Sequence, residues 1–394
     1  MASPVDTSVK FFREDFPGAP TLNGVAGSLI GLLDACLCTG FGLRSATSLV
    51  VAGGEATLTL ASDAKNGNLL NSVILVEGSS ITDLNGEQRV TWASSTELKF
   101  ATAAADGTAS GSITVKTAPA GWEKKFTGTN KAVFKTLAVE ANTSYLQVSD
   151  TGTTNANVRM YETMTDVDTG TGAAPTVAQL ASGGYWAKSA TANVTPIRWD
   201  LFSDARAFYY CPAPYSAQAE QYIGQGCWFY GDPIAFKSND AFSTAIFFGN
   251  QDNSQFTHLG SVFHTTSVDG PRVARGYSGL GASIPCWSKP QSGSSAISGE
   301  DSFLGPFPSQ TDGALLLSEY LLVDTATAGL QLVRRGRMPG ARHAPQYALG
   351  GVFGRKDTVT VGGKRFYVTS ANTSASDVGS AGGRMFFDIT GPWR

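Results

Sequence analysis

Short runs that alternate apolar and polar residues, separated by tight-turn signals, dominate residues 48–118. The run Glu55–Leu60 is typical, because every second residue is apolar, which is the side-chain period of a half-buried strand. The turn signals between the runs are Asn66-Gly67, Asn85-Gly86 and Asp106-Gly107. Such pairs supply the positive φ that hairpin turns need. The pattern predicts a small immunoglobulin-like β-sandwich module over residues 48–118.

The remainder of the 394-residue chain divides around this module. Residues 1–47 are expected to form an N-terminal arm and one docking helix. Residues 119–394 are expected to form a larger β-rich C-terminal assembly domain, which begins after the breaker segment Ala118–Gly121. The fold class that follows is mainly β, in three parts.

The one predicted helix runs from Val25 to Leu37, with Asn23 as its cap. Its apolar residues recur at helical spacing, and its other face is nearly uncharged, since Asp34 is the only ionisable residue. A helix that is apolar most of the way round is buried on more than one side. We therefore expect it to pack against another element or another chain.

The C-terminal region is dense in aromatic residues, which favour strands. Candidate strands surround a loop rich in Gly, Thr and Ala at residues 166–184, and residues 267–313 are expected to form an extended loop region. Three exposed aromatic residues are candidates for binding a receptor or a glycan: Tyr185, Trp186 and Trp228.

Charge and composition exclude several classes of function. A net charge of −3 argues against wrapping nucleic acid, so no direct nucleic-acid binding is expected. No apolar run is long enough for a membrane span, and the polar start of the chain is not a signal peptide. Charged residues make up only 15% of the chain. Either other subunits cover much of the surface, or the chain is simply rich in strands and turns; the sequence favours neither. The odd count of five cysteines predicts free, buried thiols.

The triplet Asp-Thr-Gly, which presents the catalytic carboxylate of aspartic proteases, occurs at Asp150 and again at Asp168. The two copies lie too close in the sequence for two separate lobes, and only a single-copy dimeric protease would remain possible. Asp-Thr-Gly is also ordinary turn chemistry. We interpret both copies as turns, which predicts that either Asp tolerates replacement by Asn with a penalty of about 1 kcal/mol or less.

Other chemistry-bearing residues form no convincing site. The carboxylates Glu162, Asp166 and Asp168 would suit a glycosidase or calcium but are more typical of a solvated loop. The spacing of His258 and His264 fits no metal motif. The basic cluster comprises Arg334, Arg335, Arg337, Arg342 and His343. It is expected to bind an anion or, more typically, to pair with an acidic patch of a neighbouring subunit. No catalytic residue, cofactor or metal is predicted, and we expect no enzyme.

Three stretches resemble a family of tailed-bacteriophage virion proteins. They are the C-terminus Met385–Arg394, the N-terminal Ser3–Ile30 and the middle segment Tyr161–Gly170. The module with Asn85-Gly86 looks like a small β module that recurs in phage structural proteins. The resemblance implies virion assembly and no catalytic residues.

What the resemblance implies is a structural subunit of a tailed-phage virion, most simply a multi-copy component of the tail tube, baseplate or tip. Its partners would be copies of itself and other virion proteins, with host-surface contact if it lies at the tail tip. It would be assembled in the host cytoplasm and reside in the virion. The alternatives are a receptor- or glycan-binding phage protein and a head or capsid decoration protein.

Overall fold

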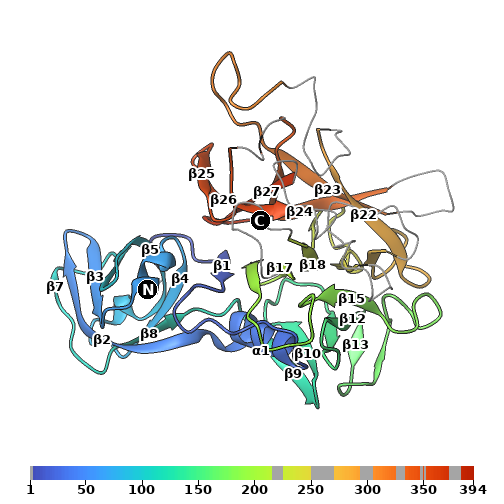
Figure 1. Ribbon diagram of the computed structural model, residues 1–394, viewed down its shortest axis with the longest axis horizontal. Helices are drawn as coiled ribbons and strands as arrows, with labels where there is room; N and C mark the ends of the chain where they lie inside the picture. The colour runs from blue at the N-terminus through green and yellow to red at the C-terminus, as the bar shows by residue number, and fades with distance from the viewer. Residues whose placement is uncertain are drawn as a thin grey trace.

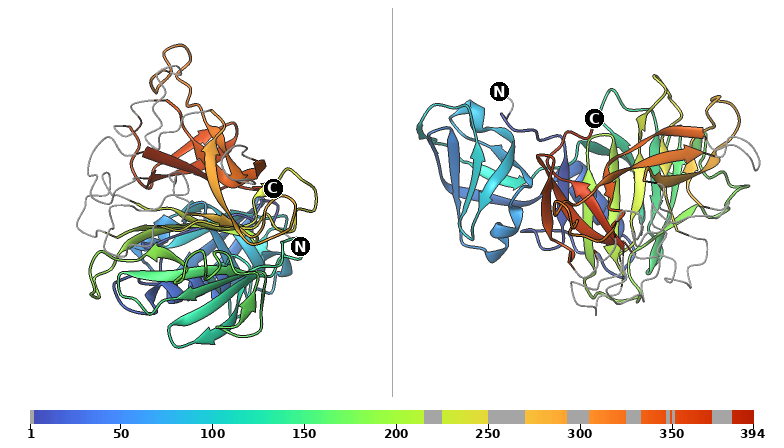
Figure 2. Two further views of the ribbon diagram at one scale, coloured as in Figure 1. Left: turned by 90° about the vertical axis from the view of Figure 1, so that its right-hand side faces the viewer. Right: turned by 90° about the horizontal axis from the view of Figure 1, so that it is seen from above.

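The computed structural model describes residues 3–214, 225–249, 270–292, 305–324, 333–346, 349, 352–371 and 383–394. The fold is mainly β, as predicted. Figure 1 shows a small β module beside a larger body of sheets, and the view from above in Figure 2 places the module at one end of the molecule. No helix in the described ranges is long and apolar enough to cross a membrane.

The small module closes into a six-stranded barrel, which differs from the immunoglobulin-like sandwich expected. The barrel strands, in the order in which they pair, are β2 (Phe41–Ala52), β3 (Glu55–Leu60), β6 (Glu97–Ala101), β5 (Gly86–Ala93), β4 (Val73–Glu77) and β8 (Thr114–Thr117). β8 pairs with β2, and β2 also pairs with β3, so the sheet has no free end. The short β7 (Gly107–Thr108) adds to β2 outside the closed circle. Closure removes the edges that a sandwich would have to protect.

The turns of the barrel differ from those expected. The tight hairpin lies at Gly53-Gly54, where both residues have positive φ, between β2 and β3. Asn66-Gly67 instead lies within a 3-10 helix, η2 (Ala64–Leu69), where the Asn66 amide donates to the carbonyls of Ala61 and Ser95. A second 3-10 helix, η3 (Thr82–Leu84), precedes β5. β2 begins at Phe41, so its first half crosses the predicted boundary at residue 48.

The predicted helix is present but shorter and irregular. It begins at Ser28, because Gly27 takes a positive φ of 84° and Asn23 caps only the preceding turn at Val25. α1 (Ser28–Leu33) continues as a π-helix, η1 (Asp34–Thr39). The buried side chains of the two segments are Leu29, Leu32, Leu33, Cys36 and Leu37. This burial agrees with the expectation that the helix packs against other elements.

The C-terminal region contains two large sheets. The first has the order β15 (Gly184–Ala187), β12 (Asn155–Tyr161), β11 (Tyr145–Ser149), β10 (Lys131–Thr136) and β9 (Trp122–Gly128). A two-stranded ribbon, β13 (Thr163–Met164) with β14 (Gly170–Thr171), lies beyond β12. Every neighbouring pair in the five-stranded sheet is antiparallel.

The second sheet runs through most of the molecule. Its strands, in spatial order, are β1 (Lys10–Arg13), β16 (Arg198–Ser203), β17 (Ala207–Ala213), β18 (Trp228–Gly231), β20 (Ala245–Ile246), β21 (Arg272–Val273), β22 (Ile284–Pro290), β23 (Ser318–Asp324), β24 (Val333–His343), β27 (Gly383–Asp388), β26 (Lys364–Ala371) and β25 (Thr358–Val361). The short β19 (Ile234–Ala235) pairs with β24. Thus β21 and β22 occupy part of residues 267–313, where the sequence predicted only loop.

Aromatic side chains on both faces of β17 hold the layers together. All seven residues of this strand are buried. Phe208 contacts Trp122 and Trp186 of the five-stranded sheet. Tyr209 is the next residue of the strand, and its ring centroid lies 4.9 Å from the ring centroid of Phe387 in β27. A strand buried on both faces reads as a continuous apolar run, which is why Ala207–Ala213 shows no alternation.

Arg89 of β5 ties the barrel to both ends of the chain. Its side chain is buried, and its guanidinium donates to four backbone carbonyls, those of Asp6 (2.7 Å), Val9 (2.8 Å), Asn71 (2.8 Å) and Ile389 (2.6 Å). Apolar core residues of the barrel and of the C-terminal sheets also belong to one continuous cluster. The barrel is therefore joined to the rest of the protein by a polar contact and by shared core.

Replacing Arg89 with Met should destabilise the protein by several kcal/mol, about 3 or more, because four backbone carbonyls, two of them in buried hydrogen bonds, lose their donor. Urea unfolding followed by tryptophan fluorescence would measure the change. Lys99→Met is the matched control, since Lys99 is on the same barrel and its ammonium makes a partly exposed pair with Glu55 and lies over the exposed Trp92 ring; it should cost about 0.5 kcal/mol or less. Equal unfolding midpoints for both variants would show that Arg89 does not tie the parts together.

Candidate functional site

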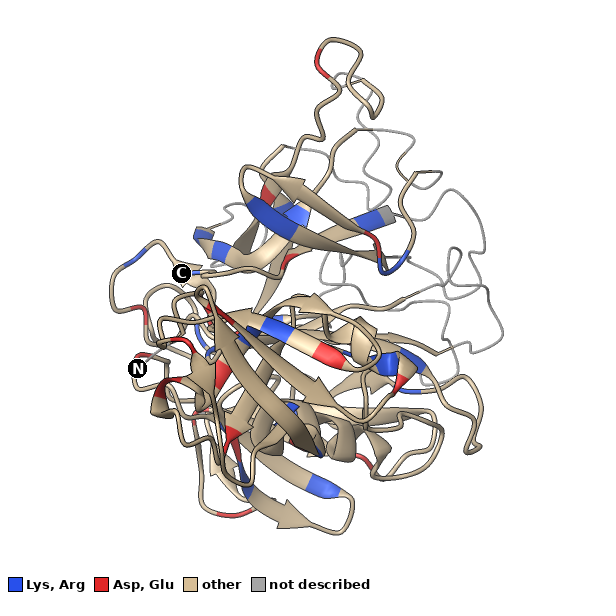
Figure 3. Cartoon of the chain, turned by 90° about the vertical axis from the view of Figure 1, so that its left-hand side faces the viewer, with Lys and Arg blue, Asp and Glu red and all other residues tan. Residues whose placement is uncertain are grey.

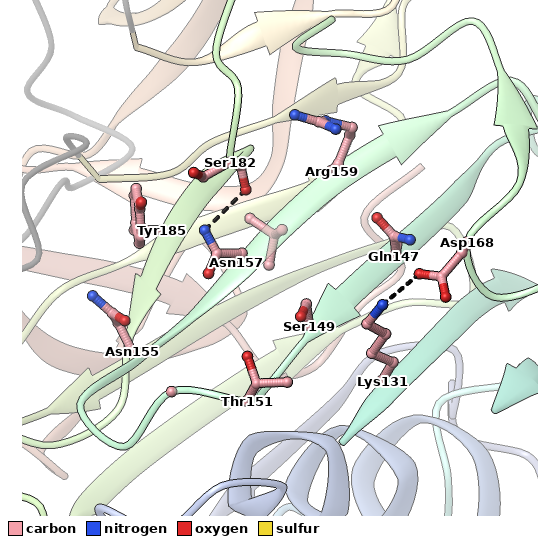
Figure 4. Close-up of a pocket in the computed structure, with 12 residues that line it drawn as sticks. Lys131, Gln147, Ser149, Thr151, Asn155, Asn157, Arg159, Asp168, Ser182 and Tyr185 are labelled. Atoms are coloured by element: carbon pink, nitrogen blue, oxygen red, sulfur yellow. Dashed lines mark hydrogen bonds and ion pairs between the residues drawn. The ribbon is translucent and has the colours of Figure 1, made fainter. Parts of the chain in front are cut away.

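A polar groove of about 440 Å³ lies on the outer face of the five-stranded sheet. Alternation along β11 and β12 creates it. Leu146, Val148 and Met160 point into the core and are fully or almost fully buried. The intervening residues point outward and line the groove: Gln147, Ser149, Asn155, Asn157 and Arg159 (Figure 4).

The antiparallel register brings these polar side chains side by side. Gln147 lies opposite Arg159, and Ser149 lies opposite Asn157, across the β11–β12 pair. Lys131 of β10 is the partner of Ser149 on the other side, and Tyr185 of β15 is the partner of Asn157. The rest of the lining comes from loops: Thr151, Gly152, Asp168 and Ser182.

Side chains of β11 and β12, which form the floor of the groove, donate hydrogen bonds to two of the loops that form its walls. The Gln147 amide donates to the carbonyl of Val167 at 2.6 Å, beside the Asp168 turn. Arg159 donates to the carbonyls of Leu180 (2.6 Å) and Ala181 (3.0 Å), and the Asn157 amide donates to that of Ser182 at 2.9 Å. These bonds fix the groove's shape on a rigid sheet.

The two Asp-Thr-Gly segments differ in structure. Asp166, rather than Asp168, makes the side-chain turn of the second segment, since its carboxylate accepts from the backbone N–H groups of Asp168 and Thr169. Asp168 itself is exposed and pairs with Lys131 at 2.7 Å across the groove (Figure 4). The second segment therefore forms a turn, as predicted, with Asp166 in place of Asp168 as the residue whose side chain stabilises it.

The turn interpretation of Asp150 is wrong. Its side chain is fully buried and forms an ion pair with the equally buried Lys188 at 2.5 Å. The same carboxylate accepts from the backbone N–H groups of Leu29 and Ile30, at the start of α1. Burial raises the pKa of Asp150, opposed by Lys188 and by these two N–H groups. Asp150 and Asp168 are thus engaged by different lysines and do not form a shared-proton pair.

Most of the other residues that the sequence suggested for a functional site are buried or make contacts within the chain. Trp186 and Trp228 are buried at 0% and 1% exposure, so the expectation that they are exposed contacts is wrong. Tyr185 is partly exposed and lines the groove. Glu162 forms a two-pronged ion pair with Arg275, at 2.5 and 2.7 Å. Within the described ranges no three His, Cys, Asp or Glu residues are grouped to hold a metal ion.

The basic cluster lies on β24, and three of its arginines pair with acidic residues of the same chain, while Arg334 lies over the Phe236 ring. Arg335 is buried and pairs with Asp240 and Asp324, while Arg337 and Arg342 both pair with Glu319. In the same strand the His343 ring lies 3.1 Å from the Tyr320 hydroxyl, and burial lowers its pKa to about 4. His258 and His264 lie outside the described residues.

The five cysteines are free, as predicted. Cys211 lies on β17 and Cys227 immediately precedes β18, with their sulfur atoms 3.2 Å apart. Burial raises the pKa of Cys38 to about 12 and raises those of Cys36, Cys211 and Cys286. These thiols are therefore protonated at neutral pH and are poor nucleophiles.

Comparison with known proteins adds no relative: no protein-family model matches the chain, and a search of curated proteins finds no similar sequence. The groove must therefore be interpreted from its own residues. Its lining consists of amide, hydroxyl and aromatic side chains, with Arg159 and with one carboxylate that pairs with Lys131.

Replacing Asp150 with Asn should cost about 3–5 kcal/mol, since the substitution leaves Lys188 buried without a counter-charge. The expectation of a small turn penalty is revised accordingly. The control is Asp168→Asn, which removes an exposed pair and should cost about 0.5 kcal/mol or less. Urea unfolding at neutral pH compares the two. A small, equal effect of both substitutions would restore the turn interpretation of Asp150.

Proposed function

We propose that this chain is a structural subunit of a tailed-phage virion, a multi-copy component of the tail tube, baseplate or tip that acts through protein–protein assembly. The resemblance of both chain ends and of Tyr161–Gly170 to phage virion proteins supports the proposal. So does an open sheet edge suited to pairing with another chain.

That edge is β25, the observation on which the proposal depends. It ends the long sheet, and in the described part of the chain no strand pairs with its outer side. Its sequence, Thr358-Val359-Thr360-Val361, carries no charge. An uncharged, β-branched edge strand is a template for pairing with another chain unless it is blocked.

One edge of the five-stranded sheet, β9, is, by contrast, protected. β9 carries Glu123, Lys124 and Lys125, and Lys124 pairs with Asp34 of η1 at 2.5 Å. Charged residues on an edge strand discourage pairing with other chains. The difference between β9 and β25 supports β25 as the edge proposed for assembly.

The hydrogen-bonding direction of β25 follows from its hairpin with β26. Val361 and Lys364 flank the two-residue turn and form the first pair, so Thr360 and Arg365 form the next. The backbone of Arg365 is directed away from β25, because its carbonyl accepts from Ile389 N–H. By the alternation of an antiparallel ladder, the N–H and C=O of Thr360 are directed away from β26, toward the free edge.

Thr360→Pro should therefore block assembly without disturbing the hairpin, since proline is tolerated on an edge strand whose N–H faces outward. Thr360→Val keeps the donor and is the control. We expect the Pro variant to be depleted at least about tenfold from purified particles in a complementation assay, with a melting temperature close to that of the Val variant. Incorporation of the Pro variant at the control level would contradict assembly through β25.

A further inference from the structure

The polar groove offers hydrogen-bonding groups that the protein leaves unused. Within the described chain, the side chains of Ser149, Thr151 and Asn155 make no hydrogen bond, although all three line the groove. Gln147 and Asn157 donate through their amide nitrogens to wall carbonyls, which leaves their amide oxygens free to accept. These groups belong to a pre-formed surface with capacity for a ligand.

The type of these groups indicates the type of ligand. Amides and hydroxyls both donate and accept hydrogen bonds, and a ligand that matches them must also do both at each position. Sugar hydroxyls meet this requirement. A phosphate group, which mainly accepts, would call for a cluster of cationic donors, and a metal ion would call for several carboxylates.

Two of the three charged side chains of the groove neutralise each other. Lys131 and Asp168 neutralise each other at 2.7 Å, and Arg159 is committed to the carbonyls of the Leu180–Ala181 wall. An acidic ligand would meet one cation, Arg159, that no acid in the described chain neutralises, in a lining made otherwise of uncharged amides and hydroxyls and of one neutralised pair. The lining therefore favours a neutral, polyhydroxylated molecule over an acidic one.

Tyr185 adds an apolar surface at one end of the groove. It lies on β15 directly across from Asn157, and Figure 4 shows it beside Asn155 at the opposite end from Lys131 and Asp168. An aromatic ring next to amide groups suits the face of a sugar ring, which has an apolar C–H surface and a polar hydroxyl rim. The groove's volume, about 440 Å³, falls in the range of about 300–1,000 Å³ typical of small-ligand sites.

We infer that this groove binds a short neutral oligosaccharide, with Asn155, Ser149 and the amide oxygens of Gln147 and Asn157 contacting hydroxyls and with Tyr185 packing on a sugar ring. The site goes beyond a purely structural role and does not depend on where the protein lies in a particle.

The test is titration of the full-length protein, by calorimetry and by saturation-transfer NMR, with a panel of neutral trisaccharides built from glucose, galactose, mannose and N-acetylglucosamine. A uronate-containing trisaccharide and inorganic phosphate serve as acidic probes. We expect at least one neutral trisaccharide to bind saturably, and Asn155→Ala and Tyr185→Ala each to weaken it by about tenfold.

Trp92→Ala is the matched control. Trp92 is an aromatic residue with 44% of its surface exposed, on the barrel and not in the groove, so its removal should leave binding unchanged. Circular dichroism melts would show that the variants remain folded, and Ser149→Ala, which removes a single unpaired hydroxyl, gives a second groove variant if Tyr185→Ala unfolds. Three outcomes would overturn the inference: no saturable binding of any neutral probe up to about 10 mM, binding of the acidic probes alone, or binding lost in Trp92→Ala but kept in the groove variants.

Discussion

The buried guanidinium of Arg355 is the contact on which the arrangement of distant segments depends. It pairs with Glu14 of the N-terminal arm at 2.5 Å and with Asp200 of β16 at 2.8 Å, and its side chain is fully buried. Asp200 in turn accepts from the Tyr367 hydroxyl of β26 at 3.0 Å. Burial lowers the pKa of Arg355, but Asp200, Tyr367 and Glu14 outweigh it and raise the pKa well above the ordinary value. An ion cluster of this kind strongly penalises the loss of any one member, so it holds the arm, β16 and the C-terminal hairpin in one arrangement.

Many of the chain's few charged residues form buried contacts of this kind between its own segments. Besides Arg355, three buried cations join separate elements: Arg89, Lys188 and Arg335. Figure 3 shows how sparsely the remaining charged residues are spread over a largely uncharged chain. A surface with few charges is poorly suited to remain bare. Cover of part of the surface by other subunits, one of the two explanations for the 15% charged content, belongs to the proposed assembly through β25.

The local sequence pattern predicted where the strands lie better than it predicted which strands pair with each other. Alternation identified the barrel strands, and the same alternation at residues 155–160 separates the groove-lining Asn155, Asn157 and Arg159 from buried neighbours, so these residues could have been identified from the sequence. Closure of the barrel depends on β2 pairing on both sides, which no short window reveals. Trp228 was misplaced because a strand buried on both faces, such as β18, carries no in–out signal. Trp186 was misplaced although β15 alternates, with Trp186 buried and Tyr185 partly exposed.

The buried ion pairs could not be predicted from the local sequence pattern, for a different reason. Asp150 looks like a turn residue because Asp-Thr-Gly is turn chemistry, yet its partners are Lys188 and the backbone of Leu29, which are distant in sequence. Charged residues are expected on the surface unless a specific partner is known. Partner identity comes from the tertiary fold, and neither composition nor spacing contains it.

The number of copies per particle tests the central claim, that the chain builds a virion through repeated assembly, most directly. Quantitative mass spectrometry of purified particles, with isotope-labelled peptides from this chain and from a virion protein of known copy number, would give that number. Our account predicts a large, symmetry-related number, on the order of tens of copies or more. Absence from purified particles, or only a few copies each, would contradict it.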